Sequence, residues 1–202
     1  MESFLKTILG ILCFWCSTSV SAQVPENAED ICPMLIGEKI PKATLQDSQG
    51  KQVELDKLVS NKPTVLVFYR GGWCPYCNLQ LSGLVKIEKN ILDLGYQIIA
   101  ISPDDYRNLQ NAESKDSINY TLLSDPNAKF IQQVGIGFKT PLMLKGFIAT
   151  KGQKGETSEI MPVPTVMILD EKGKILFEHI NPNYKERISG EMLLAVLKTL
   201  KS

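Results

Sequence analysis

Two cysteines three positions apart, Cys74 and Cys77, are the residues of this chain best suited to chemistry. The apolar run at 65–69 predicts a buried strand, and Gly71-Gly72 ends it. Pro75 is favoured in the first turn of a helix, so Cys74 is expected at a helix N-terminus. The helix dipole stabilises a thiolate there and lowers its pKa. Cys77 follows one turn later on the same face, within disulfide reach. The motif therefore indicates redox chemistry.

The same two cysteines admit two other interpretations, which are buried packing and half of a zinc site. Together with Cys32 and His179 they reach the ligand number of tetrahedral zinc. A Cys-x-x-Cys at the start of a helix that follows a strand is, however, typical of redox-active sites, so we expect no metal and no cofactor. His179 is the only histidine. We expect it to be a surface or hydrogen-bonded side chain rather than a catalytic base.

The first 22 residues read as a secretory signal. Lys6 gives a weak positive start, 8–15 is the apolar core, and the small residues at 20–22 suit cleavage before Gln23. A membrane anchor is the alternative, but the apolar run is much shorter than the roughly 20 residues of a spanning helix. We therefore expect an exported, periplasmic protein with no membrane attachment after cleavage.

Export changes the cysteine count. Cys13 and Cys16 leave with the signal, and Cys32, Cys74 and Cys77 remain. An odd number leaves at least one thiol unpaired or transiently paired, whereas a protein held by structural disulfides usually carries an even set. Cys32 is a candidate third redox thiol. We favour a partly buried, small apolar side chain in the N-terminal arm.

Length and charge restrict the remaining possibilities. The 202 residues suit one domain, and the 22 basic and 22 acidic residues balance. This balance gives no sign of nucleic acid or an anionic membrane as a partner. We expect a flexible arm over 23–35 and a single folded domain over 36–202.

The pattern of elements predicts an α/β sandwich with a mixed sheet. The expected strands are 43–45, 52–55, 65–69, 96–101, 120–123, 163–169 and 174–178. The expected helices are 56–59, the segment from Cys74 to Leu94, one beginning at 102–105, 124–134 and one capped by Ser189. The last helix is expected to direct Met192, Leu193, Val196 and Leu200 inward. The poorly patterned stretch 137–159 is interpreted as an inserted loop that partly covers the site.

Five segments carry a resemblance to a known family. They are Phe68-Tyr-Arg-Gly-Gly-Trp-Cys-Pro-Tyr-Cys77, Ile99 to Pro103, Leu122 to Pro126, Val163-Pro-Thr165 and Asp170 to Gly173. From about Ile36 to the C-terminus, the chain resembles the thioredoxin fold, in the peroxiredoxin-like branch of the alkyl hydroperoxide reductase and thiol-specific antioxidant family. The resemblance implies a three-layer α/β/α sandwich with a central mixed sheet.

The two closest templates within this fold assign the active site differently. By similarity to thioredoxin, Cys74 is the attacking cysteine and Cys77 the buried resolving cysteine. The loop with Pro164 and Thr165 then resembles the one whose cis-proline faces the disulfide. By similarity to peroxiredoxins, Cys77 takes the position of the peroxidatic cysteine, Cys74 that of a threonine and Arg70 that of a proline.

The chain departs from both templates. The distant arginine of peroxiredoxins aligns with Val163 or Pro164. The buried aspartate of thioredoxin aligns with Phe68, so the resolving thiol has no obvious proton acceptor. Arg70 is the nearest candidate cation for a thiolate or a peroxide. The other interpretation of Arg70 is a surface arginine.

The resemblance implies thiol-dependent reduction of hydroperoxides. A sulfenic acid forms at Cys77 and condenses with Cys74, and a thiol donor such as thioredoxin or a thiol-disulfide carrier reduces the disulfide. The alternative is a protein disulfide reductase or isomerase, with Cys74 as nucleophile and no peroxide step. A non-catalytic binding module that uses 137–159 is a third interpretation, which retention of both cysteines disfavours. Trp73 and Tyr76 are expected to shield the sulfurs and shape partner contacts.

Overall fold

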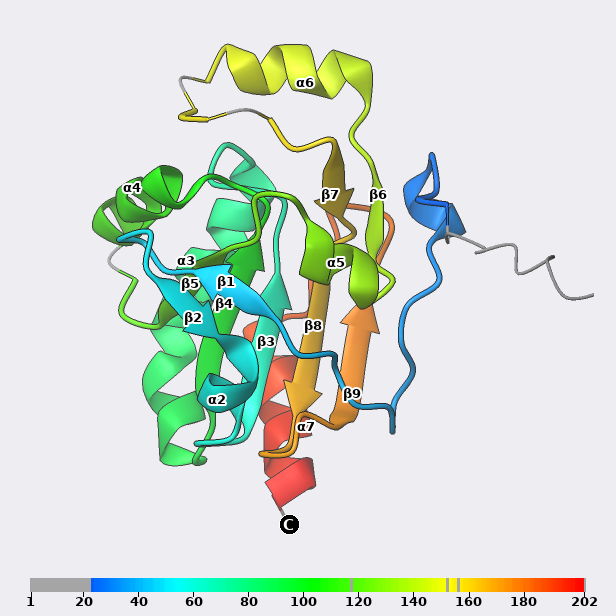
Figure 1. Ribbon diagram of the computed structural model, residues 1–202. Helices are drawn as coiled ribbons and strands as arrows, with labels where there is room; N and C mark the ends of the chain where they lie inside the picture. Colours follow the sequence, from blue (N-terminus) through cyan, green and yellow to red (C-terminus); the bar gives the residue numbers. More distant parts are fainter. Residues whose placement is uncertain (1–22, 117, 152, 156, 202) are drawn as a thin grey trace, which may run out of the picture.

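Runs of valine, isoleucine and leucine pair into a seven-stranded sheet in the computed structural model (Figure 1). The structure describes residues 23–116, 118–151, 153–155 and 157–201. The predicted signal segment lies outside the described residues. Among the described residues, no helix combines the length and the apolar character needed to cross a bilayer.

The sheet has the strand order β2-β1-β5-β4-β3-β8-β9. Its strands are β1 (Thr44–Gln46), β2 (Gln52–Glu54), β3 (Thr64–Phe68), β4 (Gln97–Ser102), β5 (Thr121–Ser124), β8 (Thr165–Leu169) and β9 (Ile175–Ile180). The pairs β3–β4 and β4–β5 are parallel, and the other pairs are antiparallel. The predicted mixed sheet is confirmed.

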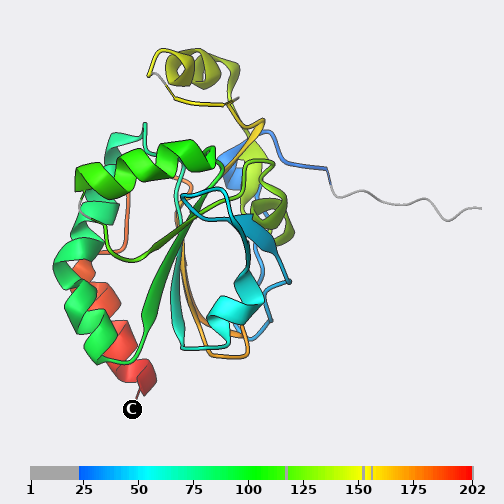
Figure 2. The ribbon, with the colours of Figure 1, turned by 60° about the vertical axis from the view of Figure 1, so that its left-hand side comes forward.

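Helices cover both faces of this sheet (Figure 2). The helices are α2 (Leu55–Val59), α3 (Pro75–Asp93), α4 (Tyr106–Asp116), α5 (Lys129–Gln133), α6 (Leu142–Ala149) and α7 (Gly190–Lys201). Val65 and Val67 of β3 pack with α3, α4 and α7, whereas Leu66 and Phe68 pack with α2 and α5. Because successive side chains of a strand point to opposite faces, both sides of β3 are buried. The result is the expected three-layer sandwich.

Helix α3 follows the sequence prediction closely. Cys74 is its N-cap residue, Pro75 its first residue and Leu94 its C-cap. Gly95 has φ +89°, as expected for a glycine just past a helix end. The buried side chains of this helix are Cys77, Leu81, Leu84 and Ile91. Cys77 is therefore part of the apolar face that holds α3 against the sheet.

Helix α7 differs from the prediction in its orientation. Ser189 caps it as expected, because the Met192 N–H donates to the Ser189 hydroxyl at 3.1 Å. Leu193 and Leu197 are fully buried, but Met192 is 53% exposed and Leu200 is also exposed. The prediction that Met192 and Leu200 point inward is wrong. Leu193 and Leu197, four positions apart, define the buried side of the helix, so Met192 and Leu200 lie on its exposed side.

The segment 137–159 is not the predicted loop. It contains strand β6 (Gly137–Lys139) and helix α6, and β7 (Ile160–Pro162) pairs antiparallel with β6. Figure 1 shows α6 standing above the end of the sheet, carried by β6 and β7. A short apolar helix without a polar face has no helical periodicity, which explains why the pattern did not predict it.

The N-terminal arm is bonded to this extension. It contains a 3-10 turn, η1 (Ala28–Asp30), and the Lys139 N–H donates to the Pro25 carbonyl at 2.9 Å. Further along, the Met34 N–H donates to the Val134 carbonyl at 3.1 Å. Gly135 has φ +75°, and a Cβ there would overlap the Cys32 backbone. Glycine at 135 therefore lets the arm lie close to the end of α5.

Candidate active site

The two cysteines occupy the point where β3 leads into α3. The Cys74 N–H donates to the Gly71 carbonyl at 3.1 Å, and the Cys77 N–H donates to the Cys74 carbonyl at 3.1 Å. Gly71 has φ +142°, and a Cβ there would lie 2.5 Å from Asp104 Oδ1 and overlap the Trp73 ring. Only glycine fits this turn. None of the described cysteines forms a disulfide, so the site is in its dithiol form.

The two thiols have opposite acidities. A hydrogen bond from Cys77 is the largest influence on Cys74, and together with the charges of Arg70 and Arg187 it lowers the pKa of Cys74 from 9.0 to about 6. Burial is the largest influence on Cys77, and with the neighbouring Cys74 it raises the pKa of Cys77 well above its usual value. At neutral pH, Cys74 is therefore the thiolate and Cys77 the protonated thiol that donates to it.

A groove of about 630 Å³ opens at Cys74. Most of the apolar side chains that line it come from the β3–α3 turn and α3, the β6–α6 extension and the loops before β8 and α7, and η1 adds Ala28 and polar residues. Apart from Ala28, these apolar side chains are Trp73, Pro75, Tyr76, Phe138, Pro141, Leu144, Phe147, Pro164, Pro182 and Tyr184. Cys77 is fully buried and does not line this groove. The two thiols thus differ in access as well as in acidity.

Arg70 is a buried residue of this groove and not a surface arginine. Its guanidinium carbon lies 5.0 Å from the centroid of the Trp73 ring and 4.4 Å from that of the Tyr184 ring. Within the described part of the chain, its Nε has no hydrogen-bond partner. Ring faces attract a cation, so the two aromatic residues help to hold this charge beside Cys74.

Pro164 lines the groove, as the thioredoxin template implies, but its geometry differs from that template. The peptide bond before Pro164 is trans, so the expected cis-proline is wrong. Thr165 is the first residue of β8 and is buried, and its hydroxyl donates to the Val163 carbonyl at 2.9 Å. This bond fixes the loop that carries Pro164, and Thr165 itself does not line the groove.

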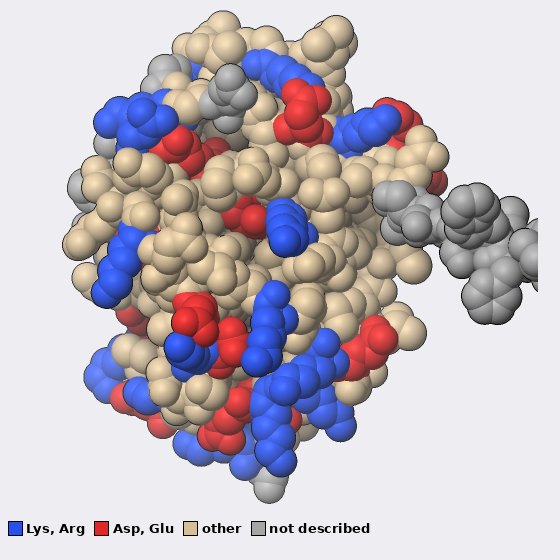
Figure 3. All heavy atoms as spheres, in the orientation of Figure 1, with Lys and Arg blue, Asp and Glu red and all other residues tan. Residues whose placement is uncertain are grey.

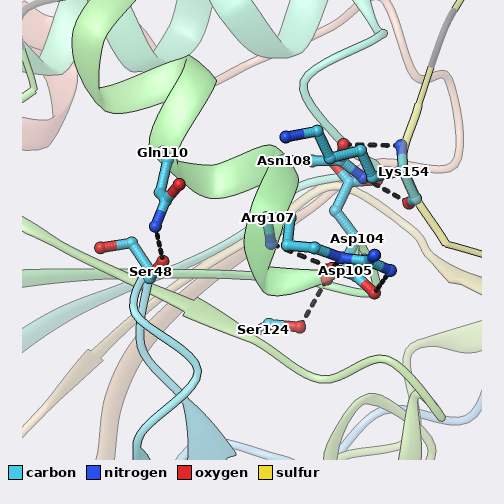
Figure 4. A network of polar contacts seen from close by, with 8 residues as sticks. All are labelled: Ser48, Asp104, Asp105, Arg107, Asn108, Gln110, Ser124 and Lys154. Atoms are coloured by element: carbon cyan, nitrogen blue, oxygen red, sulfur yellow. Dashed lines mark hydrogen bonds and ion pairs between the residues drawn. The ribbon is translucent and has the colours of Figure 1, made fainter.

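Asp104 is a site residue that the sequence analysis missed. Its carboxylate accepts a hydrogen bond from the Gly72 N–H at 2.7 Å, which ties the loop before α4 to the cysteine loop. Burial, assisted by the charges of Asp105 and Cys74, raises the pKa of Asp104 to about 7. The Ser124 hydroxyl donates to its backbone carbonyl at 2.5 Å (Figure 4). The position of Asp104 just after β4 could have predicted that it lies near the cysteines, because the carboxyl ends of neighbouring parallel strands lie at the same edge of the sheet.

Arg187 is a second missed residue. Its Nη2 lies 3.7 Å from the Cys77 sulfur, and its Nε donates to Gln80 at 2.9 Å. It belongs to the loop between β9 and α7, far from the cysteines in sequence. No local pattern marks such a contact, since it depends on how α7 docks beside α3.

Two other candidates lie apart from the groove. Cys32 is exposed, so the prediction of a partly buried side chain is wrong. His179 lies within β9, opposite Val166, and is half-buried. Neither residue lines the groove. Within the described residues, no group of three or more His, Cys, Asp or Glu side chains is placed to hold a metal ion.

The charged side chains do not form one large patch on the face that Figure 3 shows. Other side chains cover much of that face, and where Lys and Arg gather, mainly in the lower part of the view, Asp and Glu lie among them. This arrangement matches the balanced composition and adds no sign of a polyanionic partner on that face.

Comparison with known proteins identifies relatives of both templates. Residues 36–177 match the AhpC/TSA family. A thioredoxin-like protein of Haemophilus influenzae is 30% identical over 112 residues, which cover 54% of this chain and 64% of that protein. The chain thus spans about two thirds of the length of that relative. Peroxiredoxin Bcp of Escherichia coli is 27% identical over 166 residues, 82% of this chain and 97% of Bcp.

Two further similarities bear on fold and chemistry. The thiol-disulfide oxidoreductase ResA of Bacillus thuringiensis is 27% identical over 158 residues, 78% of this chain and 76% of ResA. The crystal structure of peroxidoxin BcpB from Mycobacterium tuberculosis superposes with a TM-score of 0.65 at 22% identity, covering 84% of this chain and 99% of BcpB. The predicted fold is confirmed. The expected enzyme class, a thiol peroxidase or a related oxidoreductase, agrees with these relatives.

Proposed function

This chain belongs to the AhpC/TSA family, and we propose that it reduces hydroperoxides with Cys74 as the attacking thiolate and Cys77 as the resolving thiol. The observation that carries the proposal is the contrast between the two sulfurs. Cys74 has a pKa of about 6 and lines the groove, whereas Cys77 is fully buried with a raised pKa. These roles are the reverse of those that the peroxiredoxin alignment implies.

The reaction has three steps. The Cys74 thiolate attacks one peroxide oxygen, the O–O bond breaks, and the departing alkoxide takes a proton to leave as alcohol. Cys77 then loses its proton to solvent and attacks the Cys74 sulfur, and hydroxide leaves the sulfenic acid as water after taking up a proton. An external dithiol, such as thioredoxin, supplies the two electrons that reduce the Cys74–Cys77 disulfide.

Arg70 supports the first step. Its positive charge lowers the pKa of Cys74 and borders the same groove. In a recessed site, where water screens little, one cation beside the sulfur keeps it ionised and favours the negative charge that develops on the departing oxygen. Trp73 and Tyr184 hold the guanidinium in place.

The groove favours an organic hydroperoxide over hydrogen peroxide. Its volume of about 630 Å³ lies within the range of sites that bind small organic molecules, and most of its lining is apolar. Hydrogen peroxide is small and polar and gains nothing from such a lining. Apolar groups on a substrate gain affinity from burial against residues such as Phe138, Leu144 and Phe147.

Thiol-disulfide exchange is the second candidate function. The same thiolate can attack a disulfide sulfur, and the relationship to ResA favours this chemistry. The groove also has room for a peptide segment next to a target disulfide. In this case Cys74 forms a mixed disulfide with the partner and Cys77 releases it.

Single-cysteine variants separate the two functions. The reduced chain from Gln23 onward is prepared as Cys77→Ser and as Cys74→Ser, mixed with an organic hydroperoxide in the presence of dimedone, and weighed by mass spectrometry. We expect stoichiometric labelling at Cys74 in Cys77→Ser and little labelling in Cys74→Ser. Labelling at Cys77 in Cys74→Ser would restore the peroxiredoxin assignment. No labelling in either variant, with a stable mixed disulfide in Cys77→Ser, would favour exchange.

Export remains part of the proposal. The basic, apolar and small-residue pattern of 1–22 supports secretion to the periplasm, where a partner thiol carrier would supply electrons. Expression of the full chain in a Gram-negative host, followed by fractionation and N-terminal sequencing, tests it. A periplasmic protein that begins at Gln23 is expected, and an uncleaved cytoplasmic product would refute it.

A further inference from the structure

We propose that Arg187 is a catalytic residue of the resolving step, in which its guanidinium stabilises the negative charge on the Cys77 sulfur. This inference rests on the proposed order of attack, with Cys74 first and Cys77 second. It assigns a role to a residue that no local sequence pattern marks.

The geometry places Arg187 directly on a reacting atom. Its Nη2 lies 3.7 Å from the Cys77 sulfur, in the first turn of α3. Cys77 is fully buried, so a charge on its sulfur cannot be stabilised by bulk water. A fixed guanidinium in contact with the sulfur supplies the missing stabilisation.

The guanidinium is held rigidly for this role. Its Nε donates to Gln80 of α3 at 2.9 Å. Its Nη1 donates to the Glu186 carbonyl at 2.8 Å and also to the Tyr184 carbonyl. These acceptors are neutral, and among the described residues no carboxylate forms an ion pair with Arg187. Its positive charge is therefore available to the sulfur.

The charge is needed only after the first step. In the resting pair the negative charge is on Cys74, and the Cys77 thiol donates to it. Once Cys74 is bonded to oxygen or to a partner sulfur, that charge has gone and Cys77 must lose its own proton to attack. The groups that act on Cys77 are then the charge of Arg187, a backbone hydrogen bond from Arg70 and the neighbouring Tyr69. Of these, Arg187 is the one whose side chain contacts the Cys77 sulfur.

Solvent has a path to this guanidinium that is separate from the Cys74 groove. A hollow of about 390 Å³ is lined by Arg187, Gln80, Tyr76 and Val166 among others, and it does not include Cys74. Cys77 itself does not line the hollow. Cys74 thus opens to the groove, whereas Cys77 reaches solvent only through the guanidinium of Arg187, which lines the hollow.

A model disulfide isolates the step without any peroxide. Dithiobis(nitrobenzoate) reacts with the Cys74 thiolate to give a mixed disulfide and one coloured thiolate. Cys77 then loses a proton to buffer, attacks the Cys74 sulfur and expels a second coloured thiolate. Stopped-flow absorbance follows both releases as separate phases. The fast phase reports Cys74, and the slow phase reports Cys77.

For Arg187→Gln we expect the fast phase to change less than threefold and the slow phase to slow about tenfold, because one pKa unit in a thiol changes its ionised fraction tenfold. The pH profile of the slow phase should shift to higher pH by about one unit. Arg187→Lys keeps the charge and should recover most of the rate. Lys198→Gln removes an exposed charge from α7 and should leave both phases unchanged.

Three results would overturn the assignment. The first is a slow phase in Arg187→Gln that keeps the parent rate and pH profile. The second is an equal slowing of both phases in Arg187→Gln. The third is a slow phase in Arg187→Lys that is as slow as in Arg187→Gln. If Arg187→Gln does not fold, the Lys variant and a Gln80→Leu variant, which frees the guanidinium but keeps its charge, still give the comparison. Failure of the proposed order of attack is separate, since it shows as absence of the fast phase in Cys77→Ser. Failure of peroxide reduction is also separate, since it shows as absence of dimedone labelling at Cys74 with the fast phase intact.

Discussion

The acidity of Cys74 follows mostly from neighbours in sequence. A helix N-cap position, the proline after it and a second cysteine one turn away were all evident in the Cys-Pro-Tyr-Cys motif. The expected direction, a lowered pKa, agrees with the structure, but its largest cause is the hydrogen bond from Cys77 and not the helix dipole that the sequence suggested. Arg70 was a candidate cation in the sequence, whereas the contribution of Arg187 is evident only from the fold, because it depends on which loop lies beside the helix.

The lowered pKa of Cys74 predicts a pH-dependent stability. The folded pKa is about 6 and the ordinary value is 9.0, so the contribution is fully present above pH 9 and is lost as the pH falls to 6. Between pH 8 and 6, we expect the free energy of unfolding of the reduced protein to fall relative to Cys74→Ser by up to about 1.4 kcal/mol per pH unit.

Urea unfolding under reducing conditions measures this difference at each pH. The contribution of Asp104 to the free energy of unfolding changes with pH in the opposite direction, because its raised pKa gives stability that is lost as the pH rises towards 7. Asp104 is present in both proteins, so the comparison largely removes its contribution. Parallel stability curves for the parent and Cys74→Ser would contradict the prediction.

Arg70 predicts a second residue-scale effect. Replacing it with Gln removes a nearby positive charge, so we expect the pKa of Cys74 to rise by about one unit. Thiolate absorbance in the ultraviolet, titrated in Cys77→Ser and in Cys77→Ser with Arg70→Gln, measures the shift. An unchanged titration would mean that the guanidinium does not act on the sulfur.

At the scale of elements, the sequence predicted regular segments well and irregular ones poorly. The β1–β2 hairpin, the start and end of α3 and the β8–β9 hairpin all match, because turn residues and apolar periodicity are local signals. Helix α6 and the orientation of α7 were missed. Both depend on which surface is available for packing, and that is set by distant parts of the chain.

The turn between β3 and α3 gives a prediction with an internal control. Gly71→Ala forces a Cβ into Trp73 and Asp104 at φ +142°, and we expect a loss of about 1–3 kcal/mol in the free energy of unfolding. Gly72→Ala places its Cβ 3.8 Å from Asp104 and keeps the N–H that donates to it. Denaturant unfolding should leave Gly72→Ala close to the parent, and equal losses would refute the steric argument.

At the scale of the whole molecule, the groove is a product of long-range assembly. Its walls come from η1, α3, the β6–α6 extension and the loops that carry Pro164 and Tyr184. Segment 137–159 was expected to cover part of the site, and Leu144 and Phe147 of α6 do line the groove. No local pattern gives the volume or apolar character of a space enclosed by five separate segments.

Phe147 offers a test of this assembly. Its ring packs edge-on against Trp73 at 6.4 Å between centroids and is 43% exposed. Phe147→Ala removes an apolar wall, so we expect the KM for a bulky organic hydroperoxide to rise about fivefold while the rate with hydrogen peroxide is unchanged. Met143→Ala is the control, because Met143 belongs to the same helix and is 91% exposed. Equal effects on both peroxides would contradict the role of the groove.

The order of the segments along the chain has a consequence for biosynthesis. Cys74 and Cys77 are translated early, while Pro164, Tyr184 and Arg187 come from the last quarter of the chain. A nascent chain that ends near residue 160 therefore carries both thiols without β8, on which β3 depends for one of its two partners. During that interval the groove lacks the walls formed by Pro164 and Tyr184, and Cys77 lacks the guanidinium that contacts its sulfur, so the site is complete only when the C-terminal hairpin and α7 have docked.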